Sequence, residues 1–372
     1  MREGLMRFVP RFWRGVLFRA PAICLSAGVM SFYEVQFKNP PLEVVELKDT
    51  ATLDRPLSAD KGLFTRSRGI WYVVLGATLW GVDPLFRILL LKTFTSPQIV
   101  FLEHLLLALY AVPVLIHYRH QLTGKLTLGV VGALFFVSWG GSAIATVLFT
   151  SAFTMGNFNA VLLLQKLQPL LAIILARFML KESFPARFSW YLLVALAGTY
   201  LLTFGFHGPQ LGLHDLGSQA ALYSIGAAFL WGGSTVMGKY LLQKKLGFHI
   251  VTSLRFLLAI PLLGVLLLAA GDSWKHLGST GAAAVLIVNL LFQAFIPGLL
   301  SMLLYYKGLS STKASIATLA ELAFPAVGVL INWIAFGSVL KIHELIGFLL
   351  IWGVLVMLSR STSRAAAEQP AA

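Results

Sequence analysis

Charged and strongly polar residues stand inside several apolar stretches of this chain, where chemistry is the natural explanation for them. A charge at the centre of a bilayer costs about 2.5 to 3.5 kcal/mol on insertion scales, so such residues normally face a bundle interior or a water-filled cavity. There they can bind a polar solute or a proton. The candidates for a substrate- or proton-binding site are Asp83, Glu103, His104, Gln165, Lys166, Arg255, Gln293 and Glu321.

Lys166 lies beside Gln165 near the middle of the apolar stretch 161–180. At 1.5 Å of helix per residue it lies roughly 13 Å from Asn157, so its amine does not reach the interface easily. We therefore predict that Lys166 points inward and has a partner. Glu321, at a similar depth, is the predicted partner, either in an exchangeable site for substrate charge or a proton, or in a static ion pair between two helices.

Two further candidates leave alternatives open. Asp83 precedes Pro84, which removes a backbone donor and loosens a helix. It is either a substrate or proton site, or a carboxylate that is exposed at an outer vestibule or neutralised by Arg87. His104 titrates near neutral pH when unperturbed and would relay protons beside Glu103, or it is a buried, hydrogen-bonded histidine.

The remaining candidates are amides, aromatic residues and one arginine. Gln293 follows Asn289 by one helical turn, where amides line a cavity or join helices. We place Arg255 in the same polar layer as Glu103 and His104. Trp80 and Trp231 lie too deep for an interfacial belt. We predict that they form aromatic cavity walls, with ordinary core packing as the alternative.

A strongly apolar chain carries these residues. Of its 372 residues, 58% are hydrophobic and 12% charged, whereas soluble domains average about 25% charged residues. The mean hydropathy is +0.80. A membrane span needs about 20 apolar residues, and the sequence predicts an all-α membrane protein with ten transmembrane helices. The predicted spans are residues 70–91, 97–117, 127–153, 158–180, 188–204, 216–242, 249–270, 281–306, 314–336 and 343–359.

The distribution of Lys and Arg predicts the orientation. With the first span running outward, twelve of them lie at the inner ends of the spans and four at the outer ends. Basic residues are retained on the cytoplasmic side, so we predict a multi-pass protein of the plasma (inner) membrane with both termini in the cytoplasm. Since topology explains these residues, the net charge of +14 does not indicate nucleic-acid binding.

Residues 1–68 form a basic, partly flexible amino-terminal arm that differs from the rest of the chain. Arg7, Arg11 and Arg14 fall at helical spacing among aromatic residues, which fits a helix lying on an anionic membrane surface. Alternatively, the arm is an overextended start or a dispensable tail. In a third interpretation, residues 20–30 are the core of a cleaved signal peptide.

The apolar region contains an internal repeat. Leu-Trp-Gly at 79–81 recurs at 230–232, an offset of 151, and at an offset of 156 Pro169 meets Pro325. The repeat divides the spans into two groups of five. Because five is odd, the halves enter the membrane from opposite sides, as in transporters that alternate access about a midplane site.

The predicted domains follow from this repeat. The first five-helix repeat covers 69–212, the second covers 213–360, and a short cytoplasmic tail covers 361–372.

The arrangement resembles the EamA-type transporters of the drug/metabolite transporter superfamily. Besides the ten spans and the two Leu-Trp-Gly motifs, the fourth span has Leu-Gln-Pro-Leu-Leu-Ala at 167–172 and leads to Lys-Glu at 181–182. The resemblance covers about 68–360. It implies a secondary transporter that exports small metabolites, either amino-acid-like or amphipathic, by alternating access. Gly-Ser at 337–338 replaces the Gly-Glu that the family often has there, so Glu182 lacks a counterpart in the second half.

Enzyme signatures are absent from the sequence. His343 and the glutamate after it lack a second histidine at zincin spacing, and there is no Walker loop. Cys24 is the sole cysteine, which excludes an internal disulfide and a cysteine-based metal cluster. We expect no cofactor, a small-molecule substrate and a lipid environment, with protons as the candidate coupling ion and a homodimer as a candidate assembly. The alternative is a non-transporting membrane scaffold or accessory subunit, which has no need for charges inside the bundle.

Overall fold

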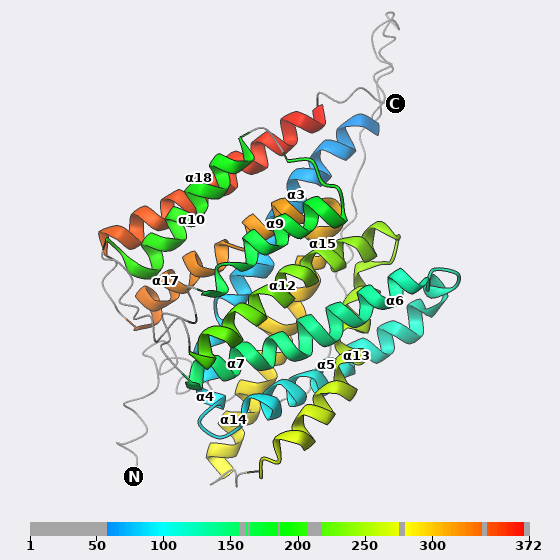
Figure 1. The fold of residues 1–372 in the computed structure, drawn as a ribbon, viewed down its shortest axis with the longest axis vertical. Coiled ribbons are helices and arrows are strands. Elements are labelled where there is room, and N and C mark those ends of the chain that lie inside the picture. Colours follow the sequence, from blue (N-terminus) through cyan, green and yellow to red (C-terminus); the bar gives the residue numbers. More distant parts are fainter. Residues whose placement is uncertain are drawn as a thin grey trace, which may run out of the picture.

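The computed structural model describes residues 58–155, 161, 164–184, 187–206, 218–274, 280–336 and 341–367. The predictions for residues 1–57 and 368–372 lie outside this part of the chain. Within it the fold is entirely helical, and Figure 1 shows the helices running roughly side by side.

The elements follow one another with short connections. In order they are α3 (Ser58–Trp80), α4 (Asp83–Leu90), α5 (Ser96–Tyr118), η1 (Arg119–Leu122), α6 (Leu128–Phe135), η2 (Phe136–Ile144), α7 (Ala145–Met155), α9 (Gln168–Met179), α10 (Phe188–Phe204), α12 (Gln219–Gln243), α13 (Phe248–Ala270), α14 (Thr280–Gln293), η3 (Ala294–Leu300), α15 (Ser301–Ser311), α16 (Ala314–Ala320), α17 (Ala323–Phe336) and α18 (Ile342–Ala367).

Seven helical stretches of the described chain are long and apolar enough to cross a membrane. They correspond to the first, second, third, sixth, seventh, eighth and tenth predicted spans. The fourth, fifth and ninth appear as the shorter apolar helices Gln168–Met179, Phe188–Phe204 and Ala314–Gly328. The all-helical membrane class is therefore confirmed, whereas the count of ten spans stays a prediction.

Three of the predicted spans are interrupted by turns, at 81–82, 166–167 and 321–322. Pro84 and Pro169 each lie in the first turn of the helix that follows the break. A proline fits there because it lacks only an N–H group that has no helical partner at that position. Each break therefore begins a new helix and brings polar side chains next to backbone groups inside the bundle.

The helices of the two halves pack against one another in matching pairs. α5 packs on α13 and α10 on α18, while α3 packs on α15 as α12 packs on α7 and η2. The third helix of each half also contains a π-helical segment, η2 and η3. In Figure 1, α10 and α18 lie along one edge, α5 and α13 lie towards the opposite edge, and α3, α9, α12 and α15 lie between them.

Two glycines explain how the interrupted helices approach their neighbours so closely. A Cβ atom on Gly81 would lie 3.0 Å from the carbonyl oxygen of Phe324, and one on Gly232 would lie 3.0 Å from the carbonyl oxygen of Gln168. Real Cβ atoms rarely come this close to a backbone atom. Each Leu-Trp-Gly motif therefore places its glycine against an interrupted helix of the other half.

Candidate functional site

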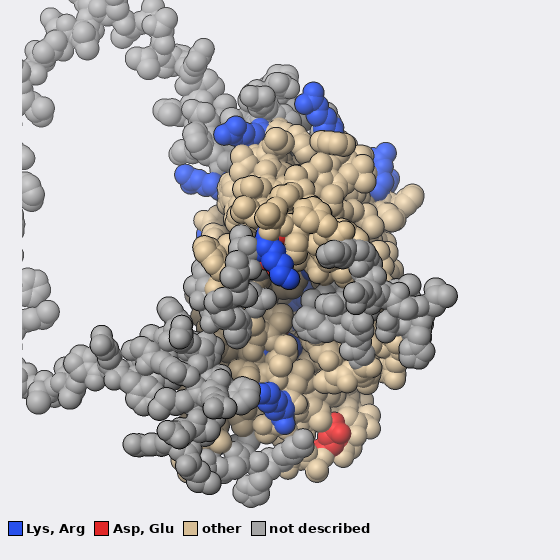
Figure 2. Space-filling view, turned by 90° about the vertical axis from the view of Figure 1, so that its left-hand side faces the viewer, with Lys and Arg blue, Asp and Glu red and all other residues tan. Residues whose placement is uncertain are grey.

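A cavity of about 220 Å³ lies among the interrupted helices and is lined by both halves of the chain. On the face shown in Figure 2, Lys and Arg side chains stand mainly at the margins, and one stands beside a hollow near the centre. Nine of the ten residues predicted as binding or wall residues line the cavity. These are Trp80, Asp83, Glu103, His104, Gln165, Trp231, Arg255, Gln293 and Glu321.

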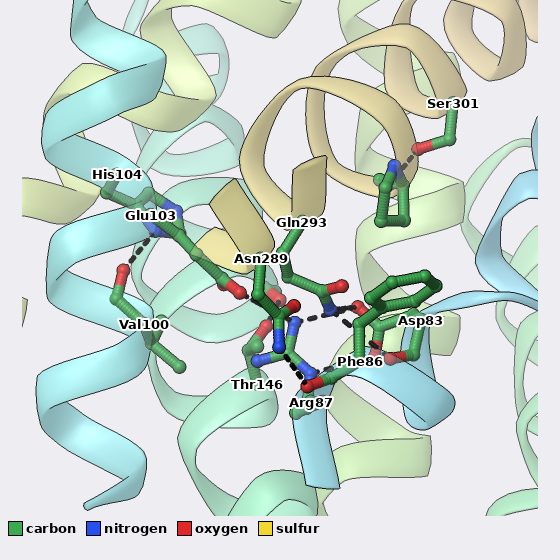
Figure 3. Close-up of polar contacts among 12 residues, drawn as sticks. Asp83, Phe86, Arg87, Val100, Glu103, His104, Thr146, Asn289, Gln293 and Ser301 are labelled. Carbon is green, nitrogen blue, oxygen red and sulfur yellow. Dashed lines mark hydrogen bonds and ion pairs between the residues drawn. The ribbon is translucent and has the colours of Figure 1, made fainter. Parts of the chain in front are cut away.

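An ion-paired group, here called the Arg87 cluster, consists of Asp83, Arg87, Glu103 and Gln293 (Figure 3). Arg87 donates to Asp83 through Nε at 2.7 Å and through Nη2 at 2.8 Å. The same Nη2 lies 3.1 Å from Oε1 of Glu103. Gln293 donates its amide N–H to the Asp83 carboxylate. One guanidinium thus serves two carboxylates.

The elements explain this geometry. α4 places Asp83 and Arg87 four residues apart, which is the spacing of neighbours on a helix surface. Glu103 comes from α5 and Gln293 from the end of α14. Arg87 and Glu103 are each 6% exposed, so the pair is shielded from water and removing either charge would leave the other uncompensated.

A second group, the Glu321 cluster, consists of Gln168, Thr235, Tyr305 and Glu321. The Glu321 carboxylate accepts a hydrogen bond from the Tyr305 hydroxyl at 2.7 Å, from the Gln168 amide at 2.7 Å and from the Thr235 hydroxyl at 3.3 Å. The two hydroxyl oxygens lie 2.8 Å apart. The hydrogen-bond partners of this buried carboxylate are therefore all neutral, and they come from α9, α12 and α15.

Lys166 does not pair directly with Glu321, contrary to the predicted ion pair. It donates to Gln165 at 3.1 Å, Gln165 donates to Gln168 at 3.0 Å, and Gln168 donates to Glu321. The Lys166 amine also lies 4.3 Å from the centre of the Phe324 ring. Two amide side chains stand between the two charges. We call this chain of hydrogen bonds the amide relay.

Arg255 and His104 also line the cavity but belong to neither cluster. Arg255 donates to the Ser142 hydroxyl at 2.6 Å and to the Tyr306 hydroxyl at 3.0 Å. His104 Nδ1 lies 2.8 Å from the carbonyl oxygen of Val100, and its ring packs edge-on against Phe256. His104 therefore has the buried, hydrogen-bonded environment that was one of its two predicted alternatives, and the predicted relay through Glu103 has no hydrogen bond joining the two side chains.

The two tryptophans line the cavity next to different aromatic residues. The Trp80 ring centre is 5.1 Å from that of Tyr305, and the Trp231 ring centre is 5.0 Å from that of Phe149. The Trp231 indole also donates to the carbonyl oxygen of Gly141 at 2.9 Å. The cavity therefore combines flat apolar surfaces with donors and acceptors at defined depths.

Sequence reasoning missed several lining residues. Arg87 was considered only as a neutralising charge, although its spacing from Asp83 gives a detectable signal. Gln168 was recognised as a polar interruption but not as a site residue. Tyr305 and Ser142 carry no distinguishing signal, since tyrosine and serine are ordinary residues of membrane helices.

Glu182, which has no counterpart in the second half, joins the two halves away from the cavity. Its carboxylate accepts hydrogen bonds from the backbone N–H groups of Ala314 at 2.7 Å and Ser315 at 3.0 Å, and from the Ser315 hydroxyl at 2.7 Å. Nearby, Lys313 donates to the Ser183 hydroxyl at 3.0 Å. These contacts, here called the Glu182 staple, fasten the start of α16 to the segment after α9.

Comparison with known proteins places this geometry in context. The sequence profile of the EamA-like transporter family matches residues 67–204 and 218–360. A protein of Fusobacterium nucleatum subsp. nucleatum named riboflavin transporter ImpX is 33% identical over 296 residues, which cover 79% of this chain and 98% of that protein. A protein of known crystal structure is 15% identical with a TM-score of 0.64, covering 82% of this chain and 99% of its own, and this likeness concerns the fold alone.

Proposed function

This chain belongs to the EamA-like transporter family, as its sequence predicted, and from that premise we propose that it carries a small amphipathic aromatic metabolite across the membrane by alternating access. The supporting observation is that residues of both halves line one cavity at the breaks of three helices. Interrupted helices at a repeat interface are where secondary transporters bind their substrates.

The proposed substrate class rests on the cavity walls and on the relative. Riboflavin is a flat heterocycle with a hydroxylated chain. Trp80 and Trp231 offer faces for stacking, which aromatic pairs prefer in offset or edge-on geometry. Gln165 and Gln293 offer amides for hydroxyl groups. Riboflavin is therefore the first compound to test.

The charges of the site favour a neutral solute. Three cations and three carboxylates lie in or next to the cavity, so the formal sum is zero. The cations are Arg87, Lys166 and Arg255, and the carboxylates are Asp83, Glu103 and Glu321. A neutral substrate can enter without leaving any of these charges unbalanced.

We further propose that the net direction of transport is export and that protons are the coupling ion. We also propose that the protein lies in the plasma membrane with both termini in the cytoplasm. The charged side chains inside the helix bundle favour transport over the scaffold alternative, because burying a charge is costly and a scaffold does not need one there. A homodimer stays a candidate assembly.

Counterflow in liposomes tests the proposal. Purified protein would be reconstituted with unlabelled riboflavin inside, and entry of labelled riboflavin would be measured. We expect exchange by the wild type and a loss of about tenfold or more in Trp231→Leu, since about 1.4 kcal/mol of lost stacking corresponds to a factor of ten. Trp190→Leu is the matched control, because Trp190 is 64% exposed and outside the cavity lining.

Absence of counterflow in the wild type would contradict riboflavin as the substrate, and equal losses in both tryptophan variants would contradict the assigned wall. Direction is measured separately in cells that make riboflavin. Export predicts more riboflavin in the medium of expressing cells than of cells with an empty vector, and depletion of the medium would instead show uptake.

A further inference from the structure

Glu321 differs from the other carboxylates of the cavity lining in its partners. Asp83 and Glu103 both pair with Arg87, and these contacts are the ion pairs within the described part of the chain. Glu321 is 8% exposed and takes part in neither. An ionised carboxylate in an apolar site is stable only when it is well paired, and otherwise it is neutralised by a proton. This contrast marks Glu321 as a group that can change its charge.

The hydrogen-bond partners of Glu321 suit both its ionised and its protonated form. The carboxylate accepts from Tyr305, Thr235 and Gln168, as observed. A protonated Glu321 would need an acceptor, and a hydroxyl group is both donor and acceptor. The Tyr305 and Thr235 hydroxyl oxygens lie 2.8 Å apart, so the Thr235 proton can turn from Glu321 to the Tyr305 oxygen, which leaves the Thr235 oxygen free to accept from an O–H group on Oε1. A guanidinium, by contrast, has donors only and could not make this exchange.

The amide relay carries the change to the other half. In the structure every donor of the relay points towards Glu321, from the Lys166 amine through Gln165 and Gln168. Turning both amides over reverses this order, so that Gln168 would accept from a Glu321 protonated on Oε2, the oxygen that Gln168 now contacts, and Gln165 would no longer accept from the Lys166 amine. Lys166 keeps its proton, so the two arrangements differ by the one proton on Glu321.

The ends of the relay lie at the two facing helix breaks. Glu321 occupies the break between α16 and α17, and Lys166 occupies the break before α9. The other charged or titratable groups nearby are Arg255 on α13, bonded to Ser142 and Tyr306, and His104 on α5, bonded to Val100. Neither donates to Glu321 in the structure.

We propose that Glu321 binds the coupling proton of this transporter, and that Gln168 and Gln165 transmit its arrival to Lys166 across the two halves. The proton comes from water in the cavity and leaves to water on the other side of the membrane. Proton uptake thereby changes the hydrogen bonds that join the two interrupted helices. The inference rests on the proposed transport function for its coupling step, but not for proton binding itself.

Proton binding is tested without any substrate by infrared difference spectroscopy of the purified protein between about pH 5 and pH 9, a range that brackets the titration of a carboxyl in an apolar site. We expect a band of a buried carboxylic acid that Glu321→Gln removes and Glu344→Gln keeps. Glu344 lies on α18, outside the cavity lining, and accepts from the Lys341 backbone, so it is the matched control. A band that survives Glu321→Gln would overturn the proton site.

The relay has its own test in the same measurement. Gln168→Met keeps the length of the side chain and removes its polar atoms. We expect the pH at which the Glu321 band appears to move by about one unit or more, since one unit corresponds to about 1.4 kcal/mol, the scale of one hydrogen bond to a charged group. An unchanged midpoint would overturn the relay.

Coupling is tested in liposomes with riboflavin and an imposed pH gradient. With one proton per substrate, a gradient of one pH unit supports about tenfold accumulation. We expect the gradient to drive accumulation by the wild type and by Glu344→Gln, whereas in Glu321→Gln it should drive none, whatever exchange of riboflavin that variant retains. A gradient response in Glu321→Gln, or counterflow without any response in the wild type, would overturn the coupling. Absence of all riboflavin movement would instead contradict the proposed substrate, and the infrared result would then decide the proton site.

Discussion

The Arg87 cluster and the Glu321 cluster line the same cavity, but they balance negative charge in different ways. In the first, a guanidinium with a permanent charge lies within 3.1 Å of two carboxylates. In the second, a carboxylate is surrounded by an amide and two hydroxyls. Permanent charges fix a geometry, whereas neutral donors that can also accept allow a group to gain or lose a proton. A glutamate therefore fixes the geometry of the site in the Arg87 cluster, whereas in the Glu321 cluster a glutamate can change its protonation state.

The largest effect is expected from removing the cation of the Arg87 cluster. Arg87→Met leaves two buried carboxylates without a cation, and breaking a buried pair in this way typically costs about 3 to 5 kcal/mol. We expect the variant to lose most of its thermal stability in detergent, measured as a lower unfolding temperature. Lys92→Met, just after α4 and exposed, is the control, because an exposed charge contributes little to stability. A stable Arg87→Met would show that the cluster does not fix the geometry.

The glycines of the two Leu-Trp-Gly motifs give the next largest effect. An added methyl group would press on the backbone of an interrupted helix, and overpacking of this kind costs about 1 to 3 kcal/mol. We expect Gly81→Ala and Gly232→Ala to destabilise the protein by similar amounts, because both close distances are 3.0 Å. Gly132→Ala, where no atom lies within 4 Å of an added Cβ, is the control. A large difference between the two motifs would contradict their equivalent roles.

Replacing one glutamate by glutamine in each cluster compares the charged partner of one with the neutral partners of the other. Glu103→Gln weakens a charged hydrogen bond to Arg87 and should cost about 1.5 kcal/mol, whereas Glu321→Gln keeps a neutral group among neutral partners and should cost less than about 1 kcal/mol. Equilibrium unfolding of the two variants would measure both losses. If the Glu321 variant lost more stability than the Glu103 variant, the distinction between the clusters would be wrong.

The smallest expected effect concerns the tryptophans. Trp231→Phe removes the hydrogen bond to the Gly141 carbonyl and should cost about 1 kcal/mol. Trp80→Phe keeps a ring next to Tyr305 and should cost less. Unfolding temperatures of the two variants measure this difference, and the reverse order would show that packing rather than hydrogen bonding dominates at these walls.

Residue types and the order of the motifs were sufficient to predict the membrane class, the family and many of the polar residues that line the cavity. They were sufficient because a charged side chain inside an apolar span normally faces the bundle interior or a water-filled cavity. The direct pairing of Lys166 with Glu321 was wrong, since equal depth says nothing about lateral distance and two glutamines occupy the space between. Tyr305 was not predicted, because a tyrosine in a membrane helix gives no signal until the carboxylate beside it is located. The count of ten spans was not confirmed, since three of the predicted spans appear within the described chain as apolar helices of 10–17 residues.

The Glu182 staple has a consequence for the resting state of the molecule. The carboxylate belongs to the first half and the helix start that it holds belongs to the second, while residues 337–338 offer no second carboxylate in the matching position. The contacts of Glu182 across the two halves therefore have no counterpart from a carboxylate at 337–338, although the halves repeat one another in sequence. A hydrogen bond to a charged group contributes about 1.5 to 3 kcal/mol, so one such bond would favour the stapled conformation by roughly ten- to a hundredfold in the empty protein. In a cycle that alternates between two conformations, the protein would wait in the stapled one, and only a cargo or a proton that bound the other conformation more tightly would tip the balance.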